Sequence, residues 1–249
     1  MAYNPFSLKT KTILVTGASS GIGRAIAMEC SKLGATVVIT ARNEERLKET
    51  LMKLEGEQPG YINADLSKDE DIKYLVDNCP QLDGLVNCAG FTKIKPFQFA
   101  SKEDYKNVME TNFFGPTELT RLLVNSKKIS FGASIVFISS ISGVFTSYMG
   151  NSMYSASKSA INGLVKNIAL ELSLKKIRVN SVNPGMIETN ILTEENITGE
   201  QMEEDMKRYP LKRYGKPEDV AFAAIYLLSD ASSWITGSNI LIDGGYTLQ

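Results

Sequence analysis

The fold is decided by residues 12–27, which read Thr-Ile-Leu-Val-Thr-Gly-Ala-Ser-Ser-Gly-Ile-Gly-Arg-Ala-Ile-Ala. The first five are β-branched or apolar, which is typical of a strand buried on both faces of a parallel sheet. Gly17, Gly21 and Gly23 follow with small residues between most of them, so backbone N–H groups can approach a ligand without obstruction by Cβ atoms. Apolar residues at helical spacing come next and indicate a helix whose positive N-terminal end faces this glycine loop.

This strand, loop and helix predict a cradle for a pyrophosphate group. Glycine spacing alone also fits a tight turn that binds nothing, so the interpretation depends on the rest of the chain. The candidate ligand-binding residues of the loop are Gly17, Ser19, Ser20, Gly21, Ile22 and Gly23.

Composition excludes several classes of protein. The chain has 249 residues, 43% of them hydrophobic and 22% charged, with a formal net charge of −1. This length fits one α/β domain over residues 1–249, and near-neutral charge without a long basic cluster argues against nucleic acid binding. We see no apolar run long enough to span a bilayer and no signal-peptide pattern. We therefore expect a cytoplasmic protein that does not bind membranes.

The chain contains no histidine. Catalysis by Ser-His-Asp or Cys-His groups and zinc ligation by histidine are therefore excluded. Cys30, Cys79 and Cys88 are scattered and lack C-x-x-C spacing, which argues against disulfides and against a thiolate metal site. We expect no metal, and acid–base chemistry must use Tyr, Lys, Asp, Glu or Cys.

Strand and helix patterns alternate along the chain. We predict strands over 12–16, 36–40, 61–64, 82–86, 133–138, 177–182 and 239–242, and later helices over 44–54, 69–77, 101–124, 153–174 and 217–228. Seven strands alternating with helices favour an α/β fold with a doubly wound parallel sheet. Ligands of such sheets bind beyond the carboxyl ends of the strands. The glycine loop, Asp65, residues 87–90, Ser140 and residues 184–185 all follow predicted strands.

A second signal is the pair Tyr154 and Lys158, four residues apart in a predicted helix. This spacing places both on one helical face, and an ammonium charge lowers the pKa of a phenol from about 10 toward the neutral range. We expect Tyr154 to exchange a proton with a substrate oxygen that Ser140 orients. Two simpler interpretations stay open. Such Tyr and Lys pairs are usually solvated neighbours, and Ser139 or Ser142 fits the role of Ser140 equally well.

Further motifs complete a pattern. They are the loop from Thr16 to Gly23, the N-x-A-G turn of Asn87, Ala89 and Gly90, Asn112 in Glu-Thr-Asn-Phe, the Tyr154 and Lys158 pair, and Pro184-Gly185 followed by Ile187 and Thr189. With them the chain resembles the short-chain dehydrogenase/reductases from residue 11 to 245. Cys88 departs from the family, where asparagine is commoner, and the interval from Ser140 to Tyr154 is one residue longer than expected.

The resemblance implies a single-domain Rossmann fold with helices on both faces of the sheet. It also implies hydride transfer between a nicotinamide and a carbonyl or alcohol carbon, with Tyr154 as acid or base and Ser140 polarising the oxygen. Lys158 would bind the ribose hydroxyls and lower the pKa of Tyr154, and Asn112 would complete a proton relay through water. The implied cofactor-binding residues outside the glycine loop are Arg42, Asp65, Leu66, Asn87, Ala89, Gly90, Tyr154, Lys158, Pro184, Gly185, Ile187 and Thr189.

The end of the second strand predicts which nicotinamide is used. An NAD site places a carboxylate about 20 residues beyond the glycine loop, but no carboxylate appears before Glu44, and Arg42 suits a 2′-phosphate. We expect NADP(H) to be preferred over NAD(H) by about tenfold to a thousandfold in kcat/KM. The alternative is that Arg42 merely starts a surface helix. Ser20 stands where many NADP-using relatives carry a second basic residue.

The substrate is not identified by the sequence beyond a small carbonyl or alcohol compound. Residues 186–213 are expected to form a lid over the substrate, acidic first and basic afterwards. An acidic carrier protein would be repelled by the acidic first part of this lid. A 3-oxoacyl-[acyl-carrier-protein] reductase is therefore the second candidate, and Lys127 and Lys128 would be its docking patch. A nucleotide-binding regulator without turnover is a third.

Assembly is expected from the family resemblance. The helices predicted over 101–124 and 153–174, together with the last strand, would form a homotetramer, or a dimer. The second of these helices carries an apolar surface wide enough to cover the sheet and a neighbouring subunit. Packing against the sheet alone is the simpler alternative.

Overall fold

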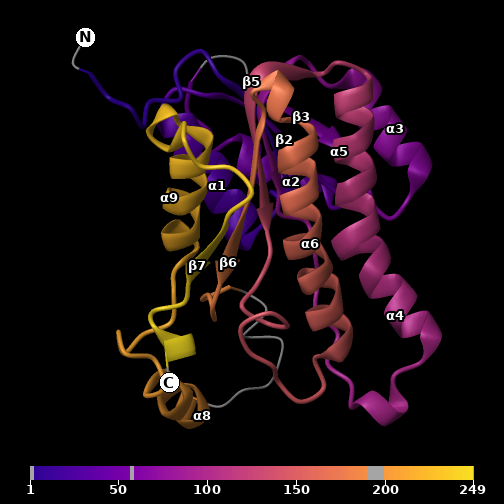
Figure 1. Ribbon diagram of the computed structural model, residues 1–249, viewed down its shortest axis with the longest axis vertical. Helices are drawn as coiled ribbons and strands as arrows, with labels where there is room; N and C mark the ends of the chain where they lie inside the picture. Colours follow the sequence, from indigo (N-terminus) through magenta and orange to yellow (C-terminus); the bar gives the residue numbers. More distant parts are fainter. Residues whose placement is uncertain (1–2, 57–58, 190–198, 249) are drawn as a thin grey trace.

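The computed structural model describes residues 3–56, 59–189 and 199–248. Its strands form a seven-stranded parallel sheet in the order β3-β2-β1-β4-β5-β6-β7 (Figure 1). The strands are β1 (Thr12–Thr16), β2 (Thr36–Ala41), β3 (Gly60–Asn63), β4 (Leu82–Asn87), β5 (Ile129–Ile138), β6 (Arg178–Pro184) and β7 (Asn239–Ile242). The predicted doubly wound α/β fold is confirmed.

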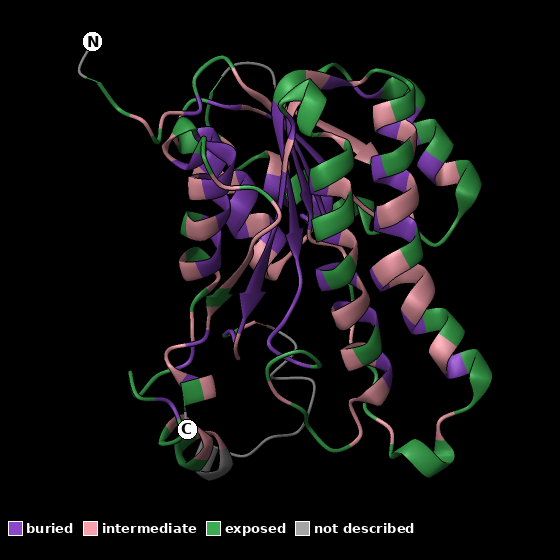
Figure 2. Cartoon of the chain, in the orientation of Figure 1, coloured by how far each residue is buried: buried purple, intermediate pink, exposed green. Residues whose placement is uncertain are grey.

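Helices cover both faces of the sheet. They are α1 (Gly21–Lys32), α2 (Glu44–Leu51), α3 (Asp69–Asn78), α4 (Lys102–Met109), α5 (Gly115–Asn125), α6 (Ser152–Glu171), α8 (Gly199–Met206) and α9 (Pro217–Leu228). Helices α1, α2 and α9 share one apolar core with the sheet, and α3, α5 and α6 share another. Figure 2 shows the buried strands between helices whose outer faces are exposed. Burial on both sides explains why the strand sequences are continuously apolar.

The helix predicted over 101–124 is wrong as a single helix. Helix α4 ends at Met109, a wider π-helical turn spans Glu110–Phe114, and α5 begins at Gly115. The turn brings Asn112 inward, where its side chain is 1% exposed. Such turns within helices often occur at functional sites, and the apolar periodicity on either side conceals them.

Other boundaries differ by smaller amounts. Strand β5 begins at Ile129, four residues earlier than predicted, and α2 ends at Leu51 instead of residue 54. Helix α8 lies within the predicted lid and was not expected. Residues 190–198 of the lid lie outside the described residues.

The site is positioned by the change of direction at β1. The chain builds β1, β2 and β3 toward one edge and then returns to place β4 on the other side of β1. The loops after β1 and β4 therefore diverge and leave a crevice at the carboxyl ends. Thr16 ties the two together, because its Oγ1 accepts hydrogen bonds of 3.0 Å from the backbone N–H groups of both Cys88 and Ala89.

No helix among the described residues is long and apolar enough to cross a membrane.

Candidate active site

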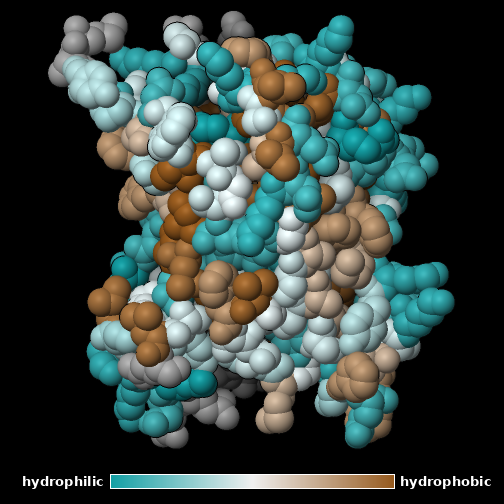
Figure 3. Space-filling view, in the orientation of Figure 1, coloured by the Kyte–Doolittle hydropathy of each residue, from teal (hydrophilic) through white to brown (hydrophobic). Residues whose placement is uncertain are grey.

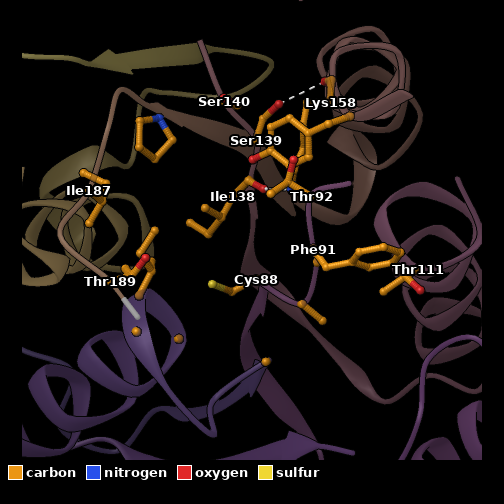
Figure 4. A pocket seen from close by; sticks show the side chains of 18 of the residues that line it. Cys88, Phe91, Thr92, Thr111, Ile138, Ser139, Ser140, Lys158, Ile187 and Thr189 are labelled. Atoms are coloured by element: carbon orange, nitrogen blue, oxygen red, sulfur yellow. Dashed lines mark hydrogen bonds between the residues drawn. The ribbon is translucent and has the colours of Figure 1, made fainter. Parts of the chain in front are cut away.

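A cavity of about 560 Å³ lies at the carboxyl ends of the strands. We call the part lined by Arg42, Arg46 and Asp65 the arginine end. The catalytic end is the part lined by Thr92, Ile94, Ser140, Ile141, Ser142, Tyr148, Met149, Asn151, Tyr154 and Lys158. Figure 4 shows Cys88 projecting into the space between Ile187 and Thr189 and the group formed by Ser139, Ser140 and Lys158.

Nearly all of the predicted cofactor residues line this cavity. They are Gly17, Ser19, Ser20, Gly21, Ile22, Gly23, Arg42, Asp65, Leu66, Ala89, Gly90, Tyr154, Lys158, Pro184, Gly185, Ile187 and Thr189. They come from six separate segments of the chain, and the parallel sheet brings these together at one edge.

The glycine loop is shaped for close approach. Gly17 and Gly21 have φ angles of +67° and +53°, which side-chain-bearing residues rarely adopt. A Cβ on Gly23 would lie 2.4 Å from the carbonyl oxygen of Gly17, and one on Gly21 would lie 3.3 Å from Thr189 Cγ2. The first N–H groups of α1 have no partner within the helix. The loop therefore fits the pyrophosphate of a dinucleotide, with the start of the lid directly over it.

The three serines after β5 take different partners. Ser139 Oγ donates to the carbonyl oxygen of Lys158 at 2.9 Å (Figure 4). Ser142 Oγ lies 2.8 Å from another hydroxyl on α6. Ser140 lies close enough to the Tyr154 side chain to lower its pKa. The longer interval between these two residues therefore does not separate them, and the role of Ser140 stays a prediction.

Burial dominates the titration of Tyr154 and Lys158. It raises the pKa of Tyr154 to about 12, and the Ser140 side chain offsets this only in part. Burial lowers the pKa of Lys158 to about 8. Lys158 Nζ donates to the carbonyl oxygen of Ile138 at 2.8 Å and lies 5.6 Å from the centre of the Tyr154 ring. The expected lowering of the Tyr154 pKa toward neutrality is wrong for the chain itself, because desolvation of the buried phenol is the largest contribution and raises the pKa.

Two predicted residues stand behind the cavity instead of lining it. Asn112 Nδ2 donates to the Phe91 carbonyl oxygen at 2.9 Å and to Ser157 Oγ at 3.1 Å, and its Oδ1 accepts from the Phe91 N–H at 3.0 Å. It braces the segment after β4 against α6. Asn87 Nδ2 donates to Thr120 Oγ1 at 3.0 Å. Their parts in proton relay and cofactor binding stay predictions.

The arginine end carries two cations. Neither Arg42 nor Arg46 forms an ion pair within the described residues. Burial favours a higher pKa for Asp65, but hydrogen bonds from a neighbouring serine and the Arg42 charge hold that pKa below its usual value. Arg24, in the first turn of α1, is engaged by Glu49 at 3.3 Å. Sequence reasoning missed Arg46, which has the pattern of a surface helix residue.

Sequence reasoning did not identify the individual residues that form the wall of the catalytic end. Thr92 and Ile94 line it from the segment after β4, and Tyr148, Met149 and Asn151 line it from the segment before α6. No motif marks these residues. Their positions next to the N-x-A-G turn and between the serine and tyrosine of the site were the available signal.

A metal centre has no support in the described part of the chain, where no group of three or more Cys, Asp or Glu is placed to hold an ion. A nicotinamide dinucleotide fits the residues present. The glycine loop suits the pyrophosphate, Arg42 and Arg46 suit a phosphate at the ribose, and Tyr154 and Lys158 lie where the reactive ring would be.

Comparison with known proteins agrees with this geometry. Residues 17–247 match the family model described as Enoyl-(Acyl carrier protein) reductase. A 3-oxoacyl-[acyl-carrier-protein] reductase FabG from Thermotoga maritima is 36% identical over 97% of this chain and 99% of its own length. A tropinone reductase homolog from Arabidopsis thaliana is 37% identical over 98% and 94%.

Solved structures give the same result. A short-chain type dehydrogenase/reductase from Mycobacterium marinum superposes with a TM-score of 0.89, at 30% identity and 98% coverage of both chains. A protein from Agrobacterium tumefaciens, described as a 2-deoxy-d-gluconate 3-dehydrogenase with bound NADP, gives 0.87 at 30% identity, covering 99% of this chain and 100% of that one. The chain belongs to the short-chain dehydrogenase/reductase family of oxidoreductases.

Proposed function

We propose that this protein is an NADP(H)-dependent oxidoreductase that interconverts a carbonyl group and a secondary alcohol. The observation that carries the proposal is the cavity itself: Ser140, Tyr154 and Lys158 line one end, and Arg42 at the other end forms no ion pair with any residue that the structure describes. Family membership and the NADP bound by the Agrobacterium protein support the choice of cofactor.

The bound nicotinamide would supply or accept the hydride. In reduction, Tyr154 Oη donates its proton to the substrate oxygen while carbon receives the hydride, so that charge and atoms balance. Ser140 Oγ donates a hydrogen bond to the same oxygen and favours the developing negative charge. The Lys158 ammonium stabilises the phenolate left on Tyr154. Asn112, which holds the segment after β4 against α6, is the proposed link to solvent.

The test is turnover with a panel of ketones and aldehydes, followed by nicotinamide absorbance. Tyr154→Phe should lose at least about a thousandfold in kcat, because it removes the transferred proton. NADPH binding, measured by fluorescence, should be retained in the variant. Tight cofactor binding without turnover of any compound in the unmodified protein would favour the non-catalytic regulator.

A second candidate is reduction of 3-oxoacyl groups on acyl carrier protein, which the Thermotoga relative's name favours. The expected docking patch is not well placed for it. Lys127 and Lys128 precede β5 and so lie at the amino ends of the strands, opposite the cavity. Lys128 Nζ also donates to the Cys79 carbonyl oxygen at 2.6 Å. The carrier-linked substrate should not exceed its N-acetylcysteamine thioester in kcat/KM, and Lys127→Glu should change neither.

We further propose assembly through α5 and α6, as a homotetramer or dimer. Leu170 and Leu174 are 76% and 93% exposed, and Figure 3 shows hydrophobic side chains over the upper end of α6. Outside its own helix backbone and chain neighbours, a Cβ on Gly163 would meet no heavy atom of the described residues within 4 Å. Gly163→Arg should therefore disturb a neighbouring subunit only. Light scattering should give a multiple of the 27.4 kDa chain mass, reduced in this variant and unchanged in Lys166→Arg.

A further inference from the structure

The wall of the catalytic end is mainly apolar and aromatic. Besides Ser140, Tyr154 and Lys158, it is lined by Ile94, Ile141, Tyr148, Met149 and Met186, with Thr92, Ser142 and Asn151 as polar members. Ile94 is 59% and Met149 98% exposed. Apolar side chains exposed around a cavity mark contact with a ligand.

The polar groups of this wall satisfy one another. Thr92 Oγ1 donates to Asn151 Oδ1 at 3.2 Å, and Asn151 Nδ2 donates to Ser142 Oγ at 3.1 Å. Ser142 Oγ in turn lies 2.8 Å from Ser155 Oγ. A polar substituent on the substrate would have to compete with these existing hydrogen bonds.

The nearest lysines are both bound to one carboxylate behind the wall, which cancels one of their two positive charges. Thr92 and Ile94 line the cavity, whereas Lys93 and Lys95 reach the two carboxylate oxygens of Asp104 on α4, at 2.6 Å and 2.7 Å. Asp104 is 7% exposed. Hydrogen bonds from Lys93 and Lys95 hold its pKa well below the usual range, so the carboxylate stays charged at any working pH.

The two arginines of the lid are also paired with carboxylates, and Lys212 Nζ donates to the backbone carbonyl oxygen of Lys207 at 2.8 Å. Arg208 pairs with Asp205 at 3.2 Å and lies over the Tyr246 ring at 4.9 Å, and Arg213 pairs with Asp219 at 2.6 Å. The lid sequence from 186 to 206 contains no Lys or Arg. Within the described residues, Lys158 is thus the cation that lines the catalytic end.

We propose that the substrate is an uncharged carbonyl compound, or the matching alcohol, with an apolar substituent, and that keto acids and phosphorylated carbonyl compounds are excluded. The proposal rests on the proposed function. An anionic group would lose its hydration against the buried Ile141 and the half-buried Met186 without gaining a partner. Lys158 is already held by the Ile138 carbonyl and the Tyr154 ring.

A matched pair of substrates isolates the charge. 3-Oxobutanamide and 3-oxobutanoate have nearly the same shape, but only the second carries a charge at neutral pH. The amide should be favoured in kcat/KM by at least about tenfold. Along the methyl ketones from 2-butanone to 2-heptanone, kcat/KM should rise by up to about fourfold per methylene. Equal or better use of the keto acid, or no rise along the series, would overturn the proposal.

Variants at the wall test the cause. Met149→Arg should raise the ratio of keto acid to amide turnover at least about tenfold, whereas Met149→Gln, which adds polarity without charge, should leave the ratio unchanged. Asp104→Asn frees two ammonium groups behind the wall and should move the ratio in the same direction by a smaller factor, with folding checked by thermal unfolding. An unchanged ratio in Met149→Arg would contradict the charge argument. Lack of turnover with every neutral compound would instead reject the proposed function.

Discussion

The two ends of the cavity treat positive charge in opposite ways. At the arginine end, Arg42 and Arg46 line the cavity without ion pairs among the described residues. Around the catalytic end, Lys93 and Lys95 line no part of it and are bound to Asp104. A cation left unpaired costs little at an exposed position and is ready to pair with a ligand phosphate. The Asp104 carboxylate cancels one of the two lysine charges and holds both ammonium groups outside the lining of the cavity.

Reversing the charge at the arginine end should have the largest effect. In Arg42→Asp the aspartate repels a 2′-phosphate and offers an acceptor to a ribose hydroxyl. The expected preference for NADPH, about tenfold to a thousandfold in kcat/KM, should change to a preference for NADH. Lys73→Asp, which makes the same charge change on α3, is the control and should leave the ratio near its original value. Equal rates with both cofactors in the unmodified protein would show that Arg42 is not the selector.

The catalytic end itself holds Lys158, a buried cation without a carboxylate partner in the described part of the chain. Its pKa is about 8 in the folded protein against 10.5 for an ordinary lysine. At pH 7 the folded state is therefore destabilised by a charged group that is poorly solvated. At 1.36 kcal/mol per pKa unit, Lys158→Met should raise the free energy of unfolding by about 3 kcal/mol at pH 7.

The pH dependence of that gain checks its origin. Between pH 8 and 10.5 the unfolded protein binds more protons at Lys158 than the folded protein does, so the unmodified protein becomes more stable as pH rises through this range. The advantage of Lys158→Met should shrink accordingly and vanish above about pH 10.5. Urea unfolding at pH 7 and pH 10 measures both values. A constant difference would mean that packing, not charge, causes the gain.

Removing the second arginine should have a smaller effect. Arg46→Ala should weaken binding of 2′,5′-ADP about tenfold, as expected for the loss of one charge-assisted hydrogen bond. Binding of 5′-ADP should not change. Calorimetry at two salt concentrations measures this without turnover, and Lys73→Ala serves as the control. Equal weakening of both nucleotides would place Arg46 near the pyrophosphate instead.

The smallest effect concerns the rate of reduction above neutral pH. Tyr154, with its pKa raised to about 12, keeps its proton throughout the working range. Lys158 loses its charge above pH 8 and then no longer stabilises the phenolate that Tyr154 becomes. The kcat for reduction should therefore be level near pH 7 and fall to half at about pH 8. A profile that stays level up to pH 10 would contradict this role for Lys158.

Much of the fold followed from periodicity. Strands β1 and β7 and helix α9 have the predicted bounds, because continuous apolar runs and a proline at the helix start mark them locally. The π-helical turn at Glu110–Phe114 could not be predicted in this way. It replaces one type of helical hydrogen bond by another without interrupting the apolar pattern, and the Asn112 side chain within it is hydrogen-bonded to the backbone of Phe91, which is distant in the sequence.

The residues of the candidate site were likewise predicted only in part. Ser140, Tyr154, Lys158 and the glycine loop belong to motifs, and they were predicted. Arg46 and Met149 were not predicted, because neither belongs to a motif and only the folded chain brings them to the cavity. The ion pairs of Asp104 with Lys93 and Lys95 could not be predicted from the sequence either, because they depend on how α4 packs behind the segment that follows β4.

The hydroxyl of Thr16 has one more consequence. By accepting from the N–H groups of Cys88 and Ala89, it fixes the separation of the two loops that border the crevice before any ligand arrives. The slot for the dinucleotide is thus built in advance, and binding need not spend free energy on ordering it. The affinity then depends chiefly on the direct contacts of the ligand with the site, above all on those of a phosphate at its ribose. A methyl group at that position, as in Thr16→Val, would leave two N–H groups without their acceptor and turn a rigid slot into one that each ligand must first assemble.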